Sequence, residues 1–415
     1  MEKEIYYHSK AKIQDYVPIV GRSTIEELRA LAERLSGKVI QNINSTFIGG
    51  GVAEILTRMV PLLNQLGVDA RWTTIKGSEG FFDVTKKFHN ALHGRKEHIS
   101  SEDFSLFLEV SNKNIEELRF QGDIIFVHDP QPIALIAKKK ELGEKWIWRC
   151  HIDVSNSDNE VWEFLRNFII EYDAAVFSAP NFAQQLPIPQ FMISPSIDPL
   201  SDKNKELPSE IIDSVLSKYG LDKDKPIIAQ ISRFDYLKDP IGVIQAFEMV
   251  RKSIDCQLIL AGGTATDDPE SVKVLQEVKD RASHNPDIHI LLIPPESDIE
   301  INALQRAAAI ILQKSIKEGF GLTITEALWK GKPVVASAVG GIPLQVKNKF
   351  TGLLCYSVEG AAYAIKRLLS NPEYAIWLGK NAQEHVRQNF LITRHLKDYL
   401  LLFISLYYNS DEIYL

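Results

Sequence analysis

The amino-acid sequence predicts an α/β protein built from two Rossmann-like, doubly wound domains. At 415 residues, the chain is longer than one hydrophobic core usually supports. Apolar runs of strand length alternate with helical stretches in both halves, which is typical of parallel sheets covered on both faces. A proline-rich stretch at 187–208 separates the halves. We expect the two domains to face each other across a ligand cleft at the carboxyl ends of their sheets.

The composition is that of an ordinary globular enzyme, with 45% hydrophobic and 24% charged residues. A net charge of −7 argues against nucleic acid or an anionic membrane as the main partner. Cys150, Cys256 and Cys355 lie in apolar contexts and form no C-x-x-C pair, so buried thiols are expected, not disulfides or a zinc site. The first residues lack the apolar core of a signal peptide, and the apolar stretch at 400–408 is too short to span a bilayer. These features predict a cytoplasmic protein.

The first half begins with a capping box, Ser23 and Glu26, and a helix whose apolar face ends at Gly37. A strand at 38–43 leads to three glycines at 49–51. A helix then runs from 52 to about 66, and Pro61 should kink it. Further strands are expected at 69–74, 123–128, 146–150 and 174–177, with helices at about 80–92, 103–119, 132–141 and 159–171.

The stretch at 187–208 contains five prolines and a polar run, so it is the predicted linker. Beyond it, strands are expected at 226–231, 257–261, 288–293, 309–312 and 333–336, with helices between them and a final amphipathic segment at about 393–408. These patterns predict an N-terminal domain over 1–200 and a second domain over 201–389. A helix within 390–415 is expected to pack back on the first domain.

Between 314 and 343, the second domain combines glycine turns with two acids. Glu318 precedes a turn at Gly319–Gly321, and Glu326 lies in the helix that follows. Backbone N–H groups and a helix N-terminus beside two carboxylates suit a ligand that carries both hydroxyls and a phosphate.

The two acids are poorly spaced for hydrolysis. On one helix, eight residues would separate them by about 12 Å, whereas the carboxylates of glycosidases lie roughly 5 to 9.5 Å apart. We therefore favour two hydrogen-bond anchors for different hydroxyls of one long ligand.

Two cations, Arg233 and Lys238, share a loop after the first strand of the second domain. Most Arg and Lys side chains are exposed and contact only water, but this fold binds ligands at the carboxyl ends of its strands. An arginine fork and a lysine point charge on one loop can bind a diphosphate.

The early glycines allow two interpretations. Gly50 and Gly51 can bind a phosphate or sugar oxygen at a helix N-terminus, or simply form a tight turn. They are not a dinucleotide fingerprint, because Glu54 occupies the position of the third glycine, and no Walker lysine follows. An NAD-dependent oxidoreductase is therefore disfavoured.

His128 and His151 each lie at the end of a predicted strand, and His151 is followed closely by Asp153. A histidine in that position can donate a hydrogen bond to a substrate hydroxyl, although a lone histidine is more often structural. Asp222 and Asp224 superficially match an acidic metal-binding pair, but their charged turn indicates solvated side chains. No metal site is predicted.

Together, these motifs resemble the retaining nucleotide-sugar glycosyltransferases of family 4 over nearly the whole chain. The two-glutamate motif at 318–327 is the strongest signal, supported by Arg233, Lys238 and the glycine turn at 340–343. Within that family, the chain is most similar to trehalose synthases of the glycosyltransferring type. This narrower resemblance rests on the segments at 44–54, 149–153 and 232–240. The resemblance implies the glycosyltransferase B architecture.

The resemblance also implies which residues bind the nucleotide. Arg233 and Lys238 would bind the donor diphosphate and stabilise the leaving nucleotide. Glu326 would accept hydrogen bonds from the ribose hydroxyls. Gly50 and Gly51 would approach the donor phosphates from the opposite domain.

The sugars are assigned in the same way. Glu318 and the backbone amides of Gly319–Gly321, including Phe320, would hold hydroxyls of the donor sugar. His151 would contact the donor sugar, and Asp153 would face the acceptor.

The implied reaction transfers glucose from ADP- or UDP-glucose to the anomeric hydroxyl of free glucose and gives α,α-trehalose with retention. No carboxylate is clearly placed as a covalent nucleophile, so front-face displacement is expected. Nucleoside-diphosphate glucose is the co-substrate, no tightly bound cofactor is implied, and stimulation by Mg²⁺ stays open. Partners are expected to be small sugars and nucleotide sugars, with no nucleic acid and no membrane. The apolar C-terminal segment and the first residues suggest a homodimer.

Three alternatives remain. The acceptor could differ, as in sucrose synthesis or polysaccharide priming. A nucleotide-sugar epimerase shares the two-domain architecture. A nucleotide-sugar-binding protein without turnover is a third alternative, against which the set of Glu318, Glu326, Arg233 and Lys238 argues.

Overall fold

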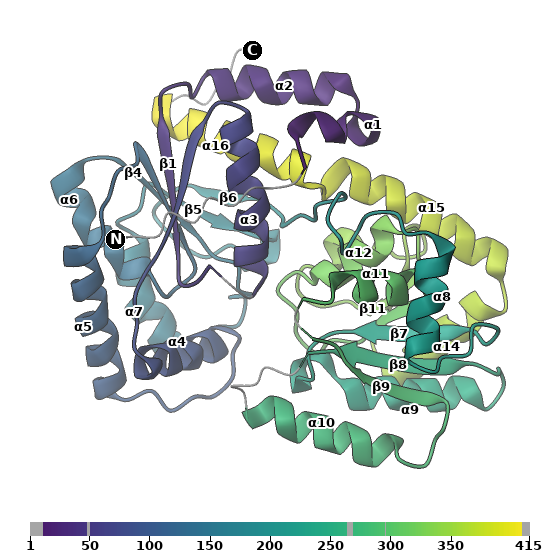
Figure 1. Cartoon of the computed structure of the whole chain (residues 1–415). Coiled ribbons are helices and arrows are strands. Elements are labelled where there is room, and N and C mark those ends of the chain that lie inside the picture. Colours follow the sequence, from purple (N-terminus) through teal and green to yellow (C-terminus); the bar gives the residue numbers. More distant parts are fainter. Residues whose placement is uncertain (1–10, 48–49, 264–268, 295, 409–415) are drawn as a thin grey trace. The chain divides into compact units, whose positions relative to one another are not determined.

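The computed structural model describes residues 11–47, 50–263, 269–294 and 296–408. The chain divides into two compact units: unit 1 comprises Met1–Ser196 with Ile392–Leu415, and unit 2 comprises Ile197–Leu391 (Figure 1). Gly49 of the predicted glycine turn and the first ten residues, on which part of the dimer prediction rested, lie outside the described residues.

Among the described residues, unit 1 contains a six-stranded parallel sheet in the order β2-β1-β3-β4-β5-β6. Its strands are β1 (Val39–Asn44), β2 (Asp69–Thr74), β3 (Ile124–His128), β4 (Lys145–Arg149), β5 (Ala174–Phe177) and β6 (Gln190–Met192). Every residue of β3 and β5 is buried, as expected for parallel strands with both faces covered.

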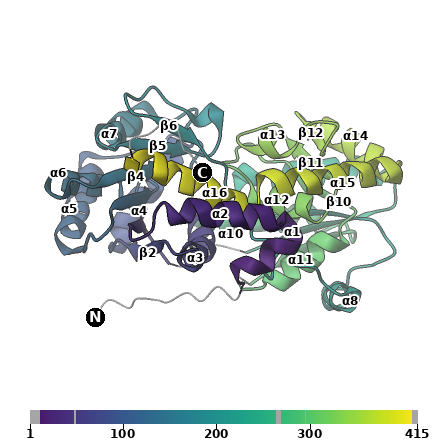
Figure 2. The same ribbon diagram turned by 90° about the horizontal axis from the view of Figure 1, so that it is seen from above.

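Helices cover both faces of this sheet (Figures 1 and 2). One group comprises α2 (Arg22–Glu33), α3 (Gly50–Gln65) and α16 (Ile392–Tyr408); the other comprises α4 (Glu79–Leu92), α5 (Ser101–Glu117), η2 (Ile133–Lys138) and α7 (Asn159–Ile169). Pro61 lies inside α3. α16 packs on α2 and α3 and buries Leu396, Leu400 and Phe403. Its apolar side chains are thus largely covered within unit 1, and the homodimer stays a prediction.

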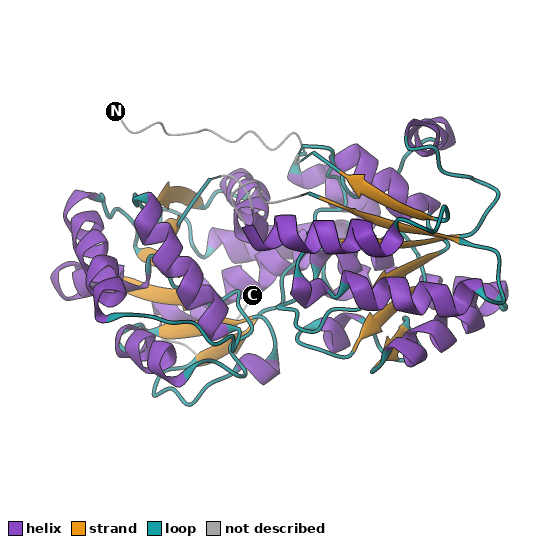
Figure 3. Cartoon of the chain, turned by 90° about the horizontal axis from the view of Figure 1, so that it is seen from below, coloured by secondary structure: helices purple, strands orange, loops and turns teal. Residues whose placement is uncertain are grey.

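The described part of unit 2 contains a second six-stranded parallel sheet, in the order β12-β11-β10-β7-β8-β9. Its strands are β7 (Ile227–Ile231), β8 (Gln257–Gly262), β9 (Ile288–Leu292), β10 (Ile310–Gln313), β11 (Val334–Ser337) and β12 (Leu353–Cys355). Helices cover both faces of this sheet as well (Figure 3). They are α9 (Pro240–Arg251), α10 (Pro269–Ala282) and α14 (Val358–Leu369) on one face, and α8 (Ser209–Lys218), α11 (Asp298–Ala307), α12 (Leu322–Trp329) and α15 (Pro372–Asn389) on the other (Figure 1).

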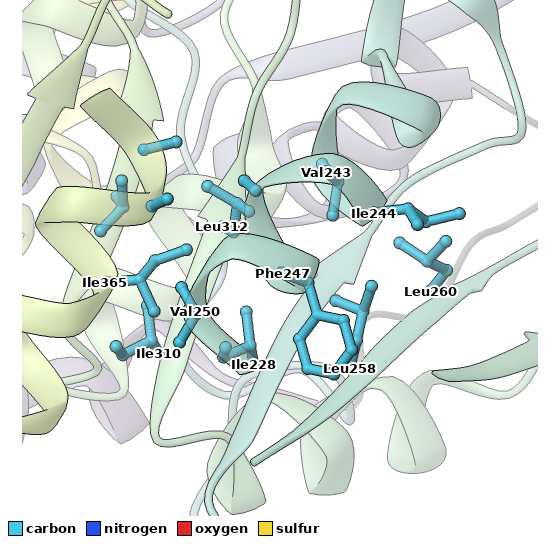
Figure 4. Packing of buried hydrophobic residues seen from close by; sticks show 14 of the residues in the cluster. Ile228, Val243, Ile244, Phe247, Val250, Leu258, Leu260, Ile310, Leu312 and Ile365 are labelled. Carbon is cyan, nitrogen blue, oxygen red and sulfur yellow. The ribbon is translucent and has the colours of Figure 1, made fainter. Parts of the chain in front are cut away.

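The core of unit 2 lies where α9 and α14 pack on β7, β8 and β10 (Figure 4). Val243 and Phe247 of α9 meet Leu258 of β8 and Leu312 of β10, and Ile365 of α14 completes the cluster. This packing fixes the carboxyl ends of the central strands, from which the predicted site residues emerge.

The predicted alternation of strands and helices is confirmed, but several elements differ. The predicted linker contains the edge strand β6, and β12 was not predicted. Both strands have only three residues, and edge strands tolerate the neighbouring prolines that argued against β6. The stretch predicted as a helix at 132–141 forms the 3₁₀ turn η2 and the short helix α6 (Lys139–Leu142).

Two expectations from composition can be compared with the structure. Cys150, Cys256 and Cys355 are buried and free. None of the helices over the described ranges combines the length and the apolar composition that crossing a bilayer requires.

Candidate functional site

Three predicted segments of unit 2 meet at one edge of its sheet. The neighbouring strands β11, β10 and β7 are followed by Gly340, by Glu318 and by the loop with Arg233 and Lys238, respectively. Because these strands are parallel, their carboxyl ends lie together. Strand order, which the sequence did not reveal, therefore brings the acid, the cations and the glycine turns into one site.

Lys238 and Glu318 form a largely buried ion pair. The Nζ of Lys238 donates to Oε2 of Glu318 at 2.6 Å, and only 17% and 9% of the two side chains are exposed. Ser315 Oγ donates to the same carboxylate oxygen at 3.1 Å. The ammonium still has N–H donors beyond the one that Glu318 receives, so Lys238 can bind a further anion.

Arg233 has a different environment. Its side chain is 62% exposed, and the carboxylate with which it pairs, that of Asp235, is 3.7 Å away. Asp235 Oδ1 meanwhile accepts the backbone N–H of Leu237 and begins the turn η4 (Tyr236–Lys238). The guanidinium of Arg233 is thus weakly paired and can reorient towards an anion.

The turn after β10 presents a run of backbone donors. Over the described ranges, the N–H groups of Gly319, Phe320 and Gly321 donate to no protein acceptor. Gly321 has a φ of +86° and is the N-cap residue of α12. A Cβ on Gly340 would lie 1.6 Å from the carbonyl oxygen of Glu318, so only glycine allows the two turns to approach this closely. Adjacent free N–H groups suit oxygen atoms of a ligand.

Glu326 is not a surface acid, because only 2% of it is exposed. Gln305 Nε2 donates to its Oε2 at 3.1 Å, and Lys330 Nζ donates to Gln305 Oε1 at 2.7 Å and to Asn204 Oδ1 at 3.0 Å. Burial lowers the pKa of Lys330 below its ordinary value. This network was not predicted from the sequence, although Lys330 follows Glu326 by one helical turn.

In unit 1, two histidines that were predicted as separate candidates lie next to each other. β3 and β4 are neighbours, and His128 Nδ1 lies 3.2 Å from His151 Nε2. The Oδ1 of Asp129 accepts the backbone N–H of His151 at 2.8 Å. Burial, followed by the charge of Arg149, lowers the pKa of His128 to about 3 and that of His151 well below its ordinary value. Both rings are therefore neutral near pH 7.

Two further residues here were missed as candidates. Asp129 has a φ of +66°, a conformation that costs energy in a residue other than glycine. Arg149 is fully buried, and its Nη2 donates to Ser178 Oγ at 3.2 Å. Both could have been found from the sequence, because each is a charged residue at the end of a strand that is mostly apolar.

The other predicted residues of unit 1, Asp153, Gly50 and Gly51, have local environments that do not by themselves indicate a ligand. Asp153 is buried, and its Oδ1 accepts from the backbone N–H and the hydroxyl of Ser155 at 3.0 and 2.6 Å. Gly50 and Gly51 are the first residues of α3, and Gly51 is exposed. In the part of the chain that the structure describes, no group of His, Cys, Asp and Glu side chains is arranged to hold a metal ion.

Comparisons with known proteins give a consistent result. Residues 42–184 match the family model "Trehalose synthase, N-terminal domain", and residues 212–385 match "Glycosyl transferases group 1". The trehalose synthase of Thermococcus litoralis is 44% identical over 94% of this chain and 96% of its own, and that of Pyrococcus horikoshii is 43% identical over 98% and 99%. The solved structure of sucrose-phosphate synthase from Thermosynechococcus elongatus superimposes with a TM-score of 0.70 at 19% identity, covering 90% of this chain and all of that one.

Proposed function

The chain belongs to the trehalose synthase family of group 1 glycosyltransferases, and on this basis we propose its substrates and mechanism. It is a hexosyltransferase with the glycosyltransferase B fold. The proposed donor is a nucleoside-diphosphate glucose, and the proposed acceptor is free glucose. The product is α,α-trehalose, formed with retention at the donor anomeric carbon.

The arrangement of Lys238, Glu318 and the Gly319–Gly321 turn at adjacent strand ends is the main support for this proposal. A cation beside free backbone N–H groups suits the diphosphate, and a carboxylate next to them suits sugar hydroxyls. We assign Arg233 and Lys238 to the donor diphosphate, and Glu318 with the turn to the donor sugar. Glu326, held by Gln305, would accept from the ribose.

The proposed chemistry is front-face displacement. The bond between the anomeric carbon and the diphosphate oxygen breaks, and a bond to the acceptor's anomeric oxygen forms on the same face. The proton of the acceptor hydroxyl passes to the departing phosphate oxygen. Arg233 and Lys238 stabilise the charge that develops on the leaving group, which is the main electrostatic contribution.

Residues of unit 1 complete the proposal. We assign His151 to the donor sugar, Asp153 to the acceptor, and Gly50 and Gly51 to the donor phosphates. These assignments rest on the family resemblance. For His151, the hydrogen-bonded neutral ring gives additional support.

The decisive assay incubates the protein with ¹⁴C-labelled ADP-, UDP- or GDP-glucose and unlabelled glucose, with and without Mg²⁺. We expect a labelled, non-reducing disaccharide that trehalase converts to glucose. Parallel reactions with fructose, glucose 6-phosphate and a glucan test other acceptors. A product only with one of these would refute the trehalose assignment, and donor binding without any product would favour a nucleotide-sugar-binding protein.

Glu326→Gln tests the ribose assignment. The substitution keeps the size of the side chain but weakens its acceptor strength, so nucleoside-diphosphate affinity should fall about tenfold, as expected for one charged hydrogen bond. Calorimetry with the nucleoside diphosphate measures this, with Glu248→Gln, an acid on α9, as the control. Unchanged affinity would remove Glu326 from the nucleotide site.

A further inference from the structure

Three side chains in unit 1 form one hydrogen-bonded chain across neighbouring strands. Asn42 lies on β1, His128 ends β3, and His151 follows β4. The Oδ1 of Asn42 is 3.1 Å from His128 Nε2, and His128 Nδ1 is 3.2 Å from His151 Nε2. Asn42 and His128 are almost fully buried, so water does not compete for these contacts.

The orientation of the Asn42 amide determines which atom donates and which accepts in each of these hydrogen bonds. The Nδ2 of Asn42 donates to the carbonyl oxygen of Arg71 at 3.2 Å, which orients the amide. Its Oδ1 therefore faces His128 and can only accept, so Nε2 of His128 must carry a hydrogen. A neutral imidazole carries one hydrogen, and Nδ1 of His128 is consequently an acceptor. The hydrogen between the two rings then belongs to Nε2 of His151, which leaves Nδ1 of His151 as a bare acceptor.

The surroundings keep both rings neutral. The guanidinium of Arg149 lowers the pKa of both rings, and His395 of α16 lowers that of His151 as well. Asp129 Oδ1 accepts the backbone N–H of His151. A second proton on His128 would place two N–H groups against each other at 3.2 Å. Protonation would thus break the chain as well as place a charge beside Arg149.

We propose that Asn42 and His128 hold His151 in its Nε2–H tautomer, so that Nδ1 of His151 accepts a hydrogen bond from a hydroxyl of the bound sugar. His128 is then a positioning residue that acts through His151. The sugar as ligand rests on the proposed function, whereas the tautomer rests on the contacts within unit 1. Over the described residues, His151 Nδ1 has no protein partner, and the ring is half-buried.

This polarity determines which ligands are accepted. A bare ring nitrogen binds a hydroxyl, which can donate, and disfavours a fluorine or a carboxylate, which can only accept. It is the opposite of the donor role expected from the sequence. His151 therefore selects for an intact hydroxyl at one position of the sugar.

The tautomer can be measured without any substrate. Long-range ¹H–¹⁵N spectra of ¹⁵N-histidine-labelled protein distinguish Nδ1–H, Nε2–H and doubly protonated rings, and His151→Ala assigns the signal among ten histidines. We expect His151 to be Nε2–H from pH 8 to pH 5. His128→Phe should abolish that preference, and His385→Gln, a control in unit 2, should leave it unchanged. An Nδ1–H or doubly protonated His151 in the wild-type protein would overturn the proposal.

Donor analogues test the consequence. Each hydroxyl of the donor glucose is replaced in turn by hydrogen or by fluorine, and kcat/KM is measured. At one position of the sugar, replacement by hydrogen and replacement by fluorine should lower kcat/KM equally, by about 10- to 100-fold. The His151→Ala variant should no longer distinguish the natural donor from these two analogues. His128→Phe should reduce it while turnover continues.

The outcomes separate this proposal from the proposed function. If no sugar donor is turned over, the proposed function fails and the spectra alone decide the tautomer. If transfer occurs but the fluorinated donors keep most of their rate at every position that His151→Ala affects, the acceptor role of His151 is refuted.

Discussion

Arg233 and Lys238 lie on the same loop, but their side chains have opposite environments. The guanidinium is exposed and weakly paired, whereas the ammonium is largely buried against Glu318. A surface charge contributes little to stability, and removing one partner of a buried pair leaves an uncompensated charge. Removal of Arg233 should therefore leave folding almost unchanged, whereas removal of Lys238 should not.

Arg233→Ala should therefore affect rate alone. We expect kcat to fall on the order of 10²- to 10³-fold, because one donor to the leaving group is lost. The free energy of unfolding should change by less than about 0.5 kcal/mol. Arg281→Ala, which removes another surface arginine of unit 2, serves as the control and should keep full activity. Wild-type turnover by Arg233→Ala would exclude Arg233 from the diphosphate site.

Lys238→Met should lower both rate and stability. The carboxylate of Glu318 keeps the hydroxyl of Ser315 but loses its counter-charge, at a cost of about 3 kcal/mol. The double variant Lys238→Met/Glu318→Gln removes the unpaired charge, so it should regain most of the stability and none of the activity. Urea unfolding and kcat of the single and double variants measure both effects. If the double variant is no more stable than Lys238→Met, the ion pair does not stabilise unit 2.

At the level of elements, the site depends on how closely two turns approach. The turn after β11 reaches the turn after β10 because Gly340 has no side chain, and Gly341 N donates to Gly319 O at 3.1 Å. Gly340 also has a φ of +54°. Its conformation and its packing thus both require glycine.

A comparison of two glycines separates these causes. Gly340→Ala and Gly220→Ala both place a side chain at positive φ, but a Cβ on Gly220 would meet no atom within 4 Å beyond its own neighbours in the chain. Gly220→Ala should cost about 1 to 2 kcal/mol from backbone strain alone. Gly340→Ala should cost more and displace Glu318, so its activity should fall at least tenfold. Equal losses of stability in urea unfolding, with activity kept in both variants, would show that the close approach is unimportant.

The same elements show how far the sequence alone leads. The inner strands were predicted to within one or two residues, because their apolar runs are buried on both faces. The edge strands β6 and β12 were missed, because three residues carry too little periodic signal. Glu318, the glycine turn and the cations were found from their residue types. The contacts of Lys238 with Glu318, and of His128 with His151, depend on strand order, which no local pattern encodes.

At the scale of the whole molecule, the two units differ in their response to acid. Among the described residues of unit 1, His128 and His395 are buried and His151 is half-buried, and the pKa values of all three are lowered chiefly by removal from water. In unit 2, the pKa values of the half-buried His289 and His385 are lowered as well, whereas those of His151 and His395 in unit 1 are lowered well below the ordinary value. Burial acts in the opposite sense on Asp129, whose pKa it raises to about 6.

These shifts determine the sign of the pH dependence. In the unfolded state, a histidine has a pKa of about 6.5. If the pKa is lower in the folded state, only the unfolded protein binds the proton as the pH falls below about 6.5, so the free energy of unfolding decreases. Asp129 does the reverse between about pH 6 and pH 4, where only the folded state keeps its proton. On unfolding, the three histidines take up about three protons and Asp129 releases about one, so roughly two protons are taken up in total. Each of them lowers the free energy of unfolding by about 1.4 kcal/mol for every pH unit that the pH falls.

We therefore expect unit 1 to lose stability steeply between pH 6.5 and pH 5. Urea unfolding of Trp329→Phe/Trp377→Phe, which keeps only the tryptophans of unit 1, would report on this unit. His395→Gln in the same background removes one of the three histidines and should flatten the dependence by about 1.4 kcal/mol per pH unit, whereas His385→Gln in unit 2 should not. An unfolding free energy of unit 1 that is constant over this range would mean that the three histidines already bind protons in the folded state, and the neutral His128–His151 pair would be excluded with them.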